Sequence, residues 1–172
     1  IVKIALAMDA GFWRWLCVNA VALAEREPEA TAYAVRHAIQ LKARIVTQDP
    51  LETTGLRTIL NLGHTIGHAI ELESGFEIAH GLAVAMGTVI ETRIGVALGL
   101  SRAEDLAELV DLLDVLGLPT QVPEEFLARS LTHLLRDKKR VGGRVVLVVP
   151  ATIGEARLHA LSLDEISQAL AG

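Results

Sequence analysis

Aromatic residues and cysteine are scarce in this sequence. Phe, Trp and Tyr make up 3% of the 172 residues, and Cys17 is the single cysteine. One cysteine excludes a disulfide within the chain and is typical of the reducing cytoplasm, where we expect this protein to reside. In its apolar surroundings Cys17 is expected to be a small core residue. Hydrophobic residues, mostly Ala and Leu, make up 51% of the chain, which indicates packed helices rather than a β-sandwich or barrel.

An excess of positive charge is also missing, because the formal net charge is -5. This charge argues against a general surface for nucleic acid or for anionic membranes. The mean hydropathy of +0.41 is high, but Lys3, Asp9 and Arg14 interrupt the most apolar stretch. No charge-free run approaches the ~18 to 20 residues that a membrane span needs. We therefore predict no membrane span and no nucleic-acid partner.

A helical period governs most of the chain. It predicts a helix or a broken pair over residues 1–26, interrupted at Gly11, and further helices over about 28–46, 56–73 and 80–98. Ser101 with Glu104 forms a capping-box pattern for a fifth helix, which ends near residue 117, and a sixth begins at 123 and ends in "RDKKR". Residues 47–55 are expected to form a loop.

The period then changes near the C-terminus. The runs "RVVLVVP" and "EARLHAL", joined by "ATIG", predict a β-hairpin, and Ser162 with Glu165 predicts a capped final helix. The chain is therefore expected to be mainly α: one multi-helical domain over residues 1–172 with a small hairpin. It opens on Ile in the middle of an apolar pattern, so we expect it to be a piece of a longer protein.

The predicted helix over 56–73 carries a polar stripe. Its members follow one another at spacings of 4, 3, 4 and 3 residues, and they are Arg57, Asn61, His64, His68 and Glu71. At 100° per residue the polar stripe lies within an arc of about 80°, where a helix normally places its apolar seam. We interpret it as lining a polar cavity, because a solvated face usually carries Lys, Glu and Gln. Gly63 and Gly67 between the histidines indicate close approach of another helix or a ligand.

A third histidine, His80, follows a glycine-containing turn that can bring it back toward His64 or His68. Neutral imidazole is a common ligand of Zn²⁺ and related metals, and catalytic zinc usually takes three protein ligands. The three histidines therefore predict a metal site, with the choice among them open and no obvious further ligand in the sequence. The remaining histidines are solitary in their patterns and are expected to be structural: His37, His133 and His159.

Several further side chains could converge on the same cavity. Lys42, Arg57 and the pair Lys138 and Lys139 would suit an anionic phosphate or carboxylate ligand. Glu52, in the loop ahead of the polar stripe, is a candidate acid or base, although a carboxylate at a helix entry is an equally good interpretation.

Three segments together resemble a known family. They are "KARIVTQDPLETTGLRTILNLGHTIGHAIE", "HGLAVAMG" and "RDKKRVGGRVVLVVPATIGEA", and they span most of the chain. They resemble the C-terminal half of the 3-dehydroquinate synthases, members of the sugar-phosphate cyclases, which are related in fold to glycerol dehydrogenases. The resemblance implies a lyase of the shikimate pathway. Such an enzyme cyclises 3-deoxy-arabino-heptulosonate 7-phosphate to 3-dehydroquinate with loss of phosphate, using NAD and a divalent metal (Zn or Co).

The resemblance also assigns roles to individual positions. It implies that His64 and His80 bind the metal, while His68 takes part in proton transfer together with Glu52. The implied substrate contacts are Lys3, Lys42, Arg57, Asn61 and Lys138 or Lys139. The third metal ligand of the family is a glutamate three residues before the lysine that matches Lys3, which places it just before Ile1.

The family's N-terminal NAD-binding domain has no counterpart in this sequence, so we expect the chain alone to be inactive. The resemblance further implies a homodimer. Two alternatives stay open. One is the domain of another sugar-phosphate cyclase, such as a deoxy-inosose or valiolone synthase. The other is a non-catalytic helical domain that binds metal through its histidines or serves as an assembly surface.

Overall fold

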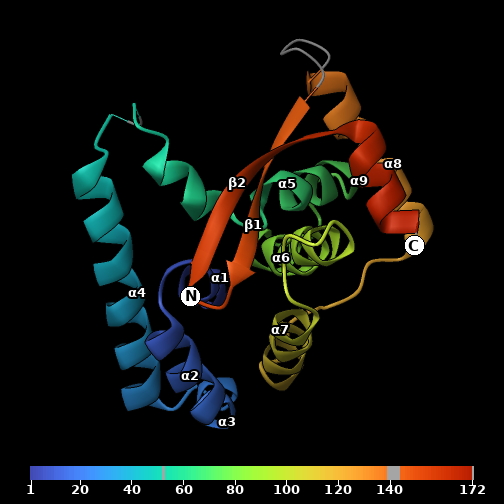
Figure 1. Ribbon diagram of the computed structural model, residues 1–172. Helices are drawn as coiled ribbons and strands as arrows, with labels where there is room; N and C mark the ends of the chain where they lie inside the picture. Colours follow the sequence, from blue (N-terminus) through green and yellow to red (C-terminus); the bar gives the residue numbers. More distant parts are fainter. Residues whose placement is uncertain (52, 139–143, 172) are drawn as a thin grey trace.

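Figure 1 shows the computed structural model of the chain, which describes residues 1–51, 53–138 and 144–171, with only the backbone described for 135–138. It confirms a mainly α fold with one antiparallel hairpin. The elements in chain order are α1 Val2–Met8, α2 Ala10–Val18, α3 Ala20–Ala24, α4 Pro28–Gln48, the 3₁₀ helix η1 Leu56–Asn61, α5 His64–Glu73, α6 His80–Ala97, α7 Ala103–Val115, α8 Glu124–Lys138, β1 Arg144–Thr152, β2 Glu155–Ser162 and α9 Leu163–Ala171.

Helix α6 is the central element of the fold. It packs against α5, α7, α9 and β1, and Figure 1 shows it in the middle of the molecule, between α5 and α7. Its sequence is apolar on nearly all sides, as expected of a helix with neighbours all round. Ala85 and Val89 belong to an apolar cluster with residues of α1, α2, α4 and α7, whereas Ile90 and Ile94 belong to a second cluster with residues of α5 and α9. The hairpin contributes residues to both clusters. The helix therefore separates two apolar clusters.

The first 26 residues form three short helices rather than one helix or a pair. The first break lies at Asp9, not at Gly11 as predicted, and Gly11 is part of α2. Asp9 has an extended backbone, and its side chain accepts a hydrogen bond from the Phe12 amide at 2.8 Å. A side chain that accepts from a free amide stabilises the start of a helix, which accounts for the new helix after Asp9.

Residues 56–73 are not one helix either. Gly63 has φ 77°, a left-handed conformation, and it separates η1 from α5. A Cβ at Gly63 would clash with the Thr88 hydroxyl and lie 2.7 Å from the Val84 carbonyl oxygen, while one at Gly67 would lie 3.1 Å from the Ala83 carbonyl oxygen. The predicted close approach of another helix is thus confirmed, and that helix is α6. The prediction that the polar stripe forms one continuous helical face is wrong, because Arg57 and Asn61 lie on η1 and the other three members lie on α5.

Two local predictions near the hairpin have different outcomes. Ser101 does not cap α7; its hydroxyl donates instead to the Pro150 carbonyl at 2.6 Å, and Arg102 takes the N-cap position. The capping box of α9 is confirmed, since the Glu165 amide donates to the Ser162 hydroxyl and the Ser162 amide donates to the Glu165 carboxylate.

Cys17 is exposed, so its predicted core position is wrong. The buried face of α2 runs through Phe12, Trp13 and Leu16, and Cys17 lies on another face. Among the residues that the structure describes, every helix is too short or too polar to cross a bilayer.

Replacing Gly63 with Ala should destabilise the fold by about 2 to 5 kcal/mol, because the new methyl group meets α6 and the backbone is left-handed. Gly55 is the matched control, since its φ is 76° and a Cβ there meets nothing within 4 Å. Gly55→Ala should cost only about 1 to 2 kcal/mol. Urea unfolding of both variants measures the difference, and equal losses would contradict the packing argument.

Candidate metal centre

A buried carboxyl group on α6, that of Glu91, holds the start of α5 in place. The Gly63 amide donates to Glu91 Oε2 at 2.8 Å, and the Ile66 amide donates to Glu91 Oε1 at 3.1 Å. Glu91 is completely buried. The first amides of a helix have no partner within the helix, so the oxygens of Glu91 supply the acceptors that Gly63 and Ile66 would otherwise lack. Glu91 therefore determines where α5 and its first residue, His64, lie relative to α6.

Three histidines meet beside this helix start. The ring centroids of His64 and His68 are 5.4 Å apart, those of His64 and His80 are 5.2 Å apart, and those of His68 and His80 are 5.8 Å apart. Successive turns of α5 supply the first two, and the beginning of α6 supplies the third. The turn after α5 thus brings His80 back to both histidines, as the sequence predicted.

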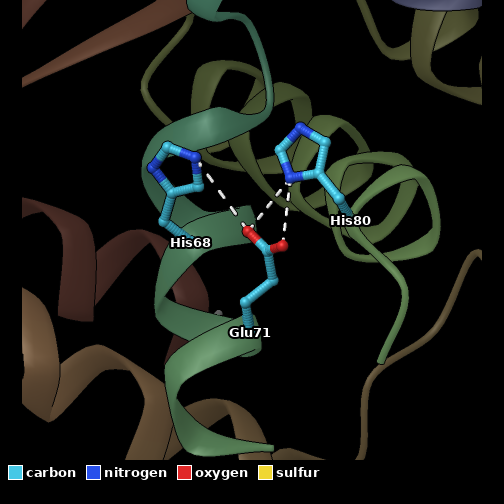
Figure 2. Close-up of side chains that lie close together, drawn as sticks. All are labelled: His68, Glu71 and His80. Atoms are coloured by element: carbon cyan, nitrogen blue, oxygen red, sulfur yellow. Dashed lines mark hydrogen bonds and ion pairs between the residues drawn. The ribbon is translucent and has the colours of Figure 1, made fainter. Parts of the chain in front are cut away.

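Glu71 lies next to two of these rings (Figure 2). Its Oε1 is 3.0 Å from His80 Nδ1, and its Oε2 is 4.0 Å from His68 Nε2. The Glu71 side chain is 12% exposed, whereas His80 is 55% and His68 59% exposed. One ligand atom from each of the three residues lies within 4.8 Å of the others, so they could together hold a metal ion.

Lys3 of α1 approaches the same cluster. Its ammonium group donates to the Leu60 carbonyl and lies 3.3 Å from each ring nitrogen of His64. Burial and the charge of Lys42 lower the pKa of Lys3 to about 8. Burial and the charge of Lys3 also lower the pKa of His64 to about 4. His64 is therefore neutral at pH 7, which is the form that binds metals.

Lys3 and His64 line a cavity of about 620 Å³. Its charged and imidazole lining residues are Lys3, Arg26, Lys42, His64 and His80, and its apolar lining includes Leu16, Leu109 and Leu113. Three cationic side chains and two imidazoles at one largely apolar cavity suit an anionic ligand held beside a metal ion.

Two predicted substrate contacts are not found at this cavity among the described residues. Arg57 and Asn61 lie on η1, and neither is among the described residues that line it. The Arg57 amide donates to Asp49 Oδ2 at 3.3 Å, and its guanidinium donates to the Pro50 carbonyl. Glu52 and Lys139 lie outside the described residues, as does the side chain of Lys138.

The histidines predicted to be structural lie elsewhere in the fold. His37 contacts Asp9 at 3.3 Å, and His133 contacts Glu73 at 3.1 Å. His159 lies on β2.

Sequence reasoning missed Glu91. Its signal was an acidic residue in the middle of an otherwise apolar helix, the only one between His80 and Ala97. Burial raises the pKa of Glu91 to about 8, although the amides of Ile66, Gly63 and Thr65 and the charge of Lys3 act in the opposite direction. A carboxyl group this deep in the fold affects stability through its protonation.

The raised pKa of Glu91 predicts a pH dependence of stability. Between its ordinary pKa of 4.5 and about 8, the folded state holds a proton that the unfolded state releases. The contribution of Glu91 is thus fully present below pH 4.5 and is lost as the pH rises through 8. Relative to Glu91→Gln, the wild-type free energy of unfolding should fall by at least about 1 kcal/mol from pH 5 to pH 8.

Urea unfolding at several pH values checks this, with the exposed Glu77→Gln as a control that should keep the wild-type slope. Parallel pH profiles for wild type and Glu91→Gln would show that Glu91 has an ordinary pKa.

Comparison with known proteins shows the family of the chain. A family model described as the 3-dehydroquinate synthase C-terminal domain matches residues 1–140. The chain is 40% identical over 172 residues to the 3-dehydroquinate synthases of Pyrobaculum neutrophilum and Pyrobaculum islandicum. Each match covers 99% of this chain and 50% of the relative, so the chain spans about half the length of the curated relatives that it matches.

Solved structures show the same fold. A 2-epi-5-epi-valiolone synthase from Streptomyces hygroscopicus subsp. jinggangensis, with NAD⁺ and Zn²⁺ bound, matches with a TM-score of 0.81 and 24% identity, over 99% of this chain and 48% of that one. A 2-deoxy-scyllo-inosose synthase matches with a TM-score of 0.66 and 20% identity, over 91% of this chain and 48% of that one.

Proposed function

The chain belongs to the 3-dehydroquinate synthase C-terminal family, and we propose that it forms the metal- and substrate-binding half of a 3-dehydroquinate synthase. The proposed reaction converts 3-deoxy-arabino-heptulosonate 7-phosphate to 3-dehydroquinate and phosphate. The convergence of His64, His80, Lys3 and Lys42 on one cavity carries the proposal. Identity of 40% to 3-dehydroquinate synthases favours this substrate over those of the related cyclases, which match at 20–24%.

The residues at the cavity fit a divalent metal such as Zn²⁺ or Co²⁺. His64 and His80 supply two imidazoles to its lining, and the low pKa of His64 keeps that ring available as a ligand. We propose these two as ligands, with a carboxylate from the preceding half of the relatives as the third. A metal bound there would supply Lewis-acid stabilisation of charge on a substrate oxygen, and NAD, proposed to bind to the preceding half, would supply the redox chemistry.

The lysines of the cavity are proposed to hold the anionic groups of the substrate. Lys3 and Lys42 come from α1 and α4, and the pKa of Lys3 reflects both its burial and the nearby charge of Lys42. The two positive charges repel each other, so a bound anion near both would be stabilised. A phosphate or carboxylate group of the substrate would be such an anion. Arg57, Asn61, Lys138 and Lys139 stay predictions as further substrate contacts.

His68 is proposed to move a proton during the reaction. It is more exposed than Glu71, lies next to both proposed metal ligands, and is not among the described residues that line the cavity. An exposed imidazole can exchange protons with solvent and pass them to a bound substrate. Glu52 stays its predicted partner. The homodimer and the cytoplasmic location also stay predictions.

Fusing the N-terminal half of the Pyrobaculum neutrophilum enzyme ahead of Ile1 should produce an active 3-dehydroquinate synthase. Phosphate release from 3-deoxy-arabino-heptulosonate 7-phosphate, with NAD and Zn²⁺ or Co²⁺ present, measures its turnover. His64→Ala and His80→Ala should each lower kcat/KM at least about 100-fold, because each removes a proposed ligand. His159→Ala, on the hairpin, is the matched control and should leave turnover unchanged.

Two results would contradict the proposal. Turnover only with the sugar phosphates of the other cyclases would assign the chain to one of those enzymes. Wild-type turnover in the His64→Ala and His80→Ala variants would indicate a domain whose histidines have no part in catalysis.

A further inference from the structure

We propose that Glu71 is a positioning residue that keeps the proton of His80 on Nδ1 and so directs the Nε2 lone pair of His80 into the cavity. Glu71 lies on α5 and His80 on α6, so this contact also determines how the second proposed ligand is oriented relative to the first. The part of the inference that concerns metal affinity rests on the proposed function. The tautomer of His80 does not.

The contact between Glu71 and His80 defines the proton's position. Both carboxylate oxygens lie close to His80 Nδ1, at 3.0 and 3.1 Å. Glu71, as a carboxylate, only accepts hydrogen bonds, so Nδ1 must donate, and in a neutral ring the lone pair is then on Nε2. Figure 2 shows the other ring nitrogen of His80 on the edge turned away from Glu71. His80 lines the cavity, while Glu71 is not among the described residues that do.

His64 repeats this arrangement with a different acceptor. Its Nδ1 lies 3.2 Å from the Leu62 carbonyl oxygen, which also only accepts, so Nδ1 donates there and Nε2 carries the lone pair. The Lys3 ammonium, a donor 3.3 Å from each ring nitrogen, can then donate to Nε2. The two histidines that line the cavity thus both have Nδ1 against an oxygen acceptor. An acceptor behind a metal-binding histidine commonly fixes its tautomer and raises its basicity.

The alternative is that Glu71 itself binds the metal together with His68 and His80. Ligand bonds of about 2.0 to 2.2 Å in a tetrahedral site place ligand atoms about 3.4 Å apart. The distance of 3.0 Å from Glu71 to His80 is shorter than this and typical of a hydrogen bond, whereas the 4.0 Å to His68 is longer. In this alternative His80 Nδ1 would also have to lose its proton. The distances therefore favour positioning over direct ligation.

The tautomer is tested first, in the 172-residue chain without metal. Long-range ¹H–¹⁵N NMR correlations identify which ring nitrogen of His80 is protonated, once His80→Gln has assigned the signals. We expect the Nδ1–H form in wild type and in Glu71→Gln, whose amide oxygen still accepts. Glu71→Ala should show a mixture of both tautomers. An unchanged His80 tautomer in Glu71→Ala would overturn the proposal.

Metal affinity is tested next, in the fusion protein described above, by competition for Zn²⁺ with a chromophoric chelator. Glu71→Ala should weaken binding about 10- to 100-fold, and Glu71→Gln less than about 10-fold. Glu73→Gln is the matched control, because Glu73 lies on the same helix and pairs with a histidine, His133, away from the cavity. It should leave both the tautomer and the affinity unchanged.

The variants separate the two roles of Glu71 from each other and from the proposed function. A loss of affinity in Glu71→Gln as large as in His80→Ala would identify Glu71 as a direct ligand and overturn the positioning role. Absence of Zn²⁺ binding by the wild-type fusion protein would contradict the proposed function, while the NMR result would still decide the tautomer. Circular dichroism of each variant confirms that the fold is retained.

Discussion

The buried carboxyl group of Glu91 joins the first turn of α5 to the middle of α6, and the candidate metal centre depends on that junction. Gly63 bends the chain so that its own amide and that of Ile66 face the carboxyl group. The absence of a side chain at Gly63 lets the bend lie against Thr88 and Val84. Burial of an acidic group is costly, and helix amides offset part of that cost. The result is a helix start whose position is determined from the core of the protein.

The proposed ligands follow from this junction. His64 is the first residue of α5 and His80 is the first residue of α6, so both rings extend from helix ends that the core holds in place. Lys3 lies on α1 and meets His64 at the cavity. A residue from the start of the chain thus meets two histidines that are close to each other in sequence. Precise placement of this kind is what metal binding and catalysis require, because small displacements of ligands cost affinity.

Much of the site could be predicted from the sequence because its key residues are close together along the chain. Two histidines four residues apart, and a third after a short turn, meet through local helical geometry alone. The polar stripe failed at Arg57 and Asn61 because a left-handed glycine conformation is invisible to helical periodicity. Glu91 was missed because its partners are backbone amides, which every sequence contains. Glu91 can accept hydrogen bonds from those amides only in a fold that places the start of α5 beside α6.

The sequence by itself determined the mainly α fold, the C-terminal hairpin, the three histidines and the family to which the chain belongs. These depend on hydrophobic period, on local spacing and on motifs, all of which are read along the chain. The tertiary structure alone decided where helices break, which face of α2 is buried, and which polar groups line the cavity. Those features depend on contacts between residues far apart in sequence, such as Gly63 with Thr88, Lys3 with His64 and Glu71 with His80. Burial and close packing select among local options that the sequence leaves nearly equal in free energy.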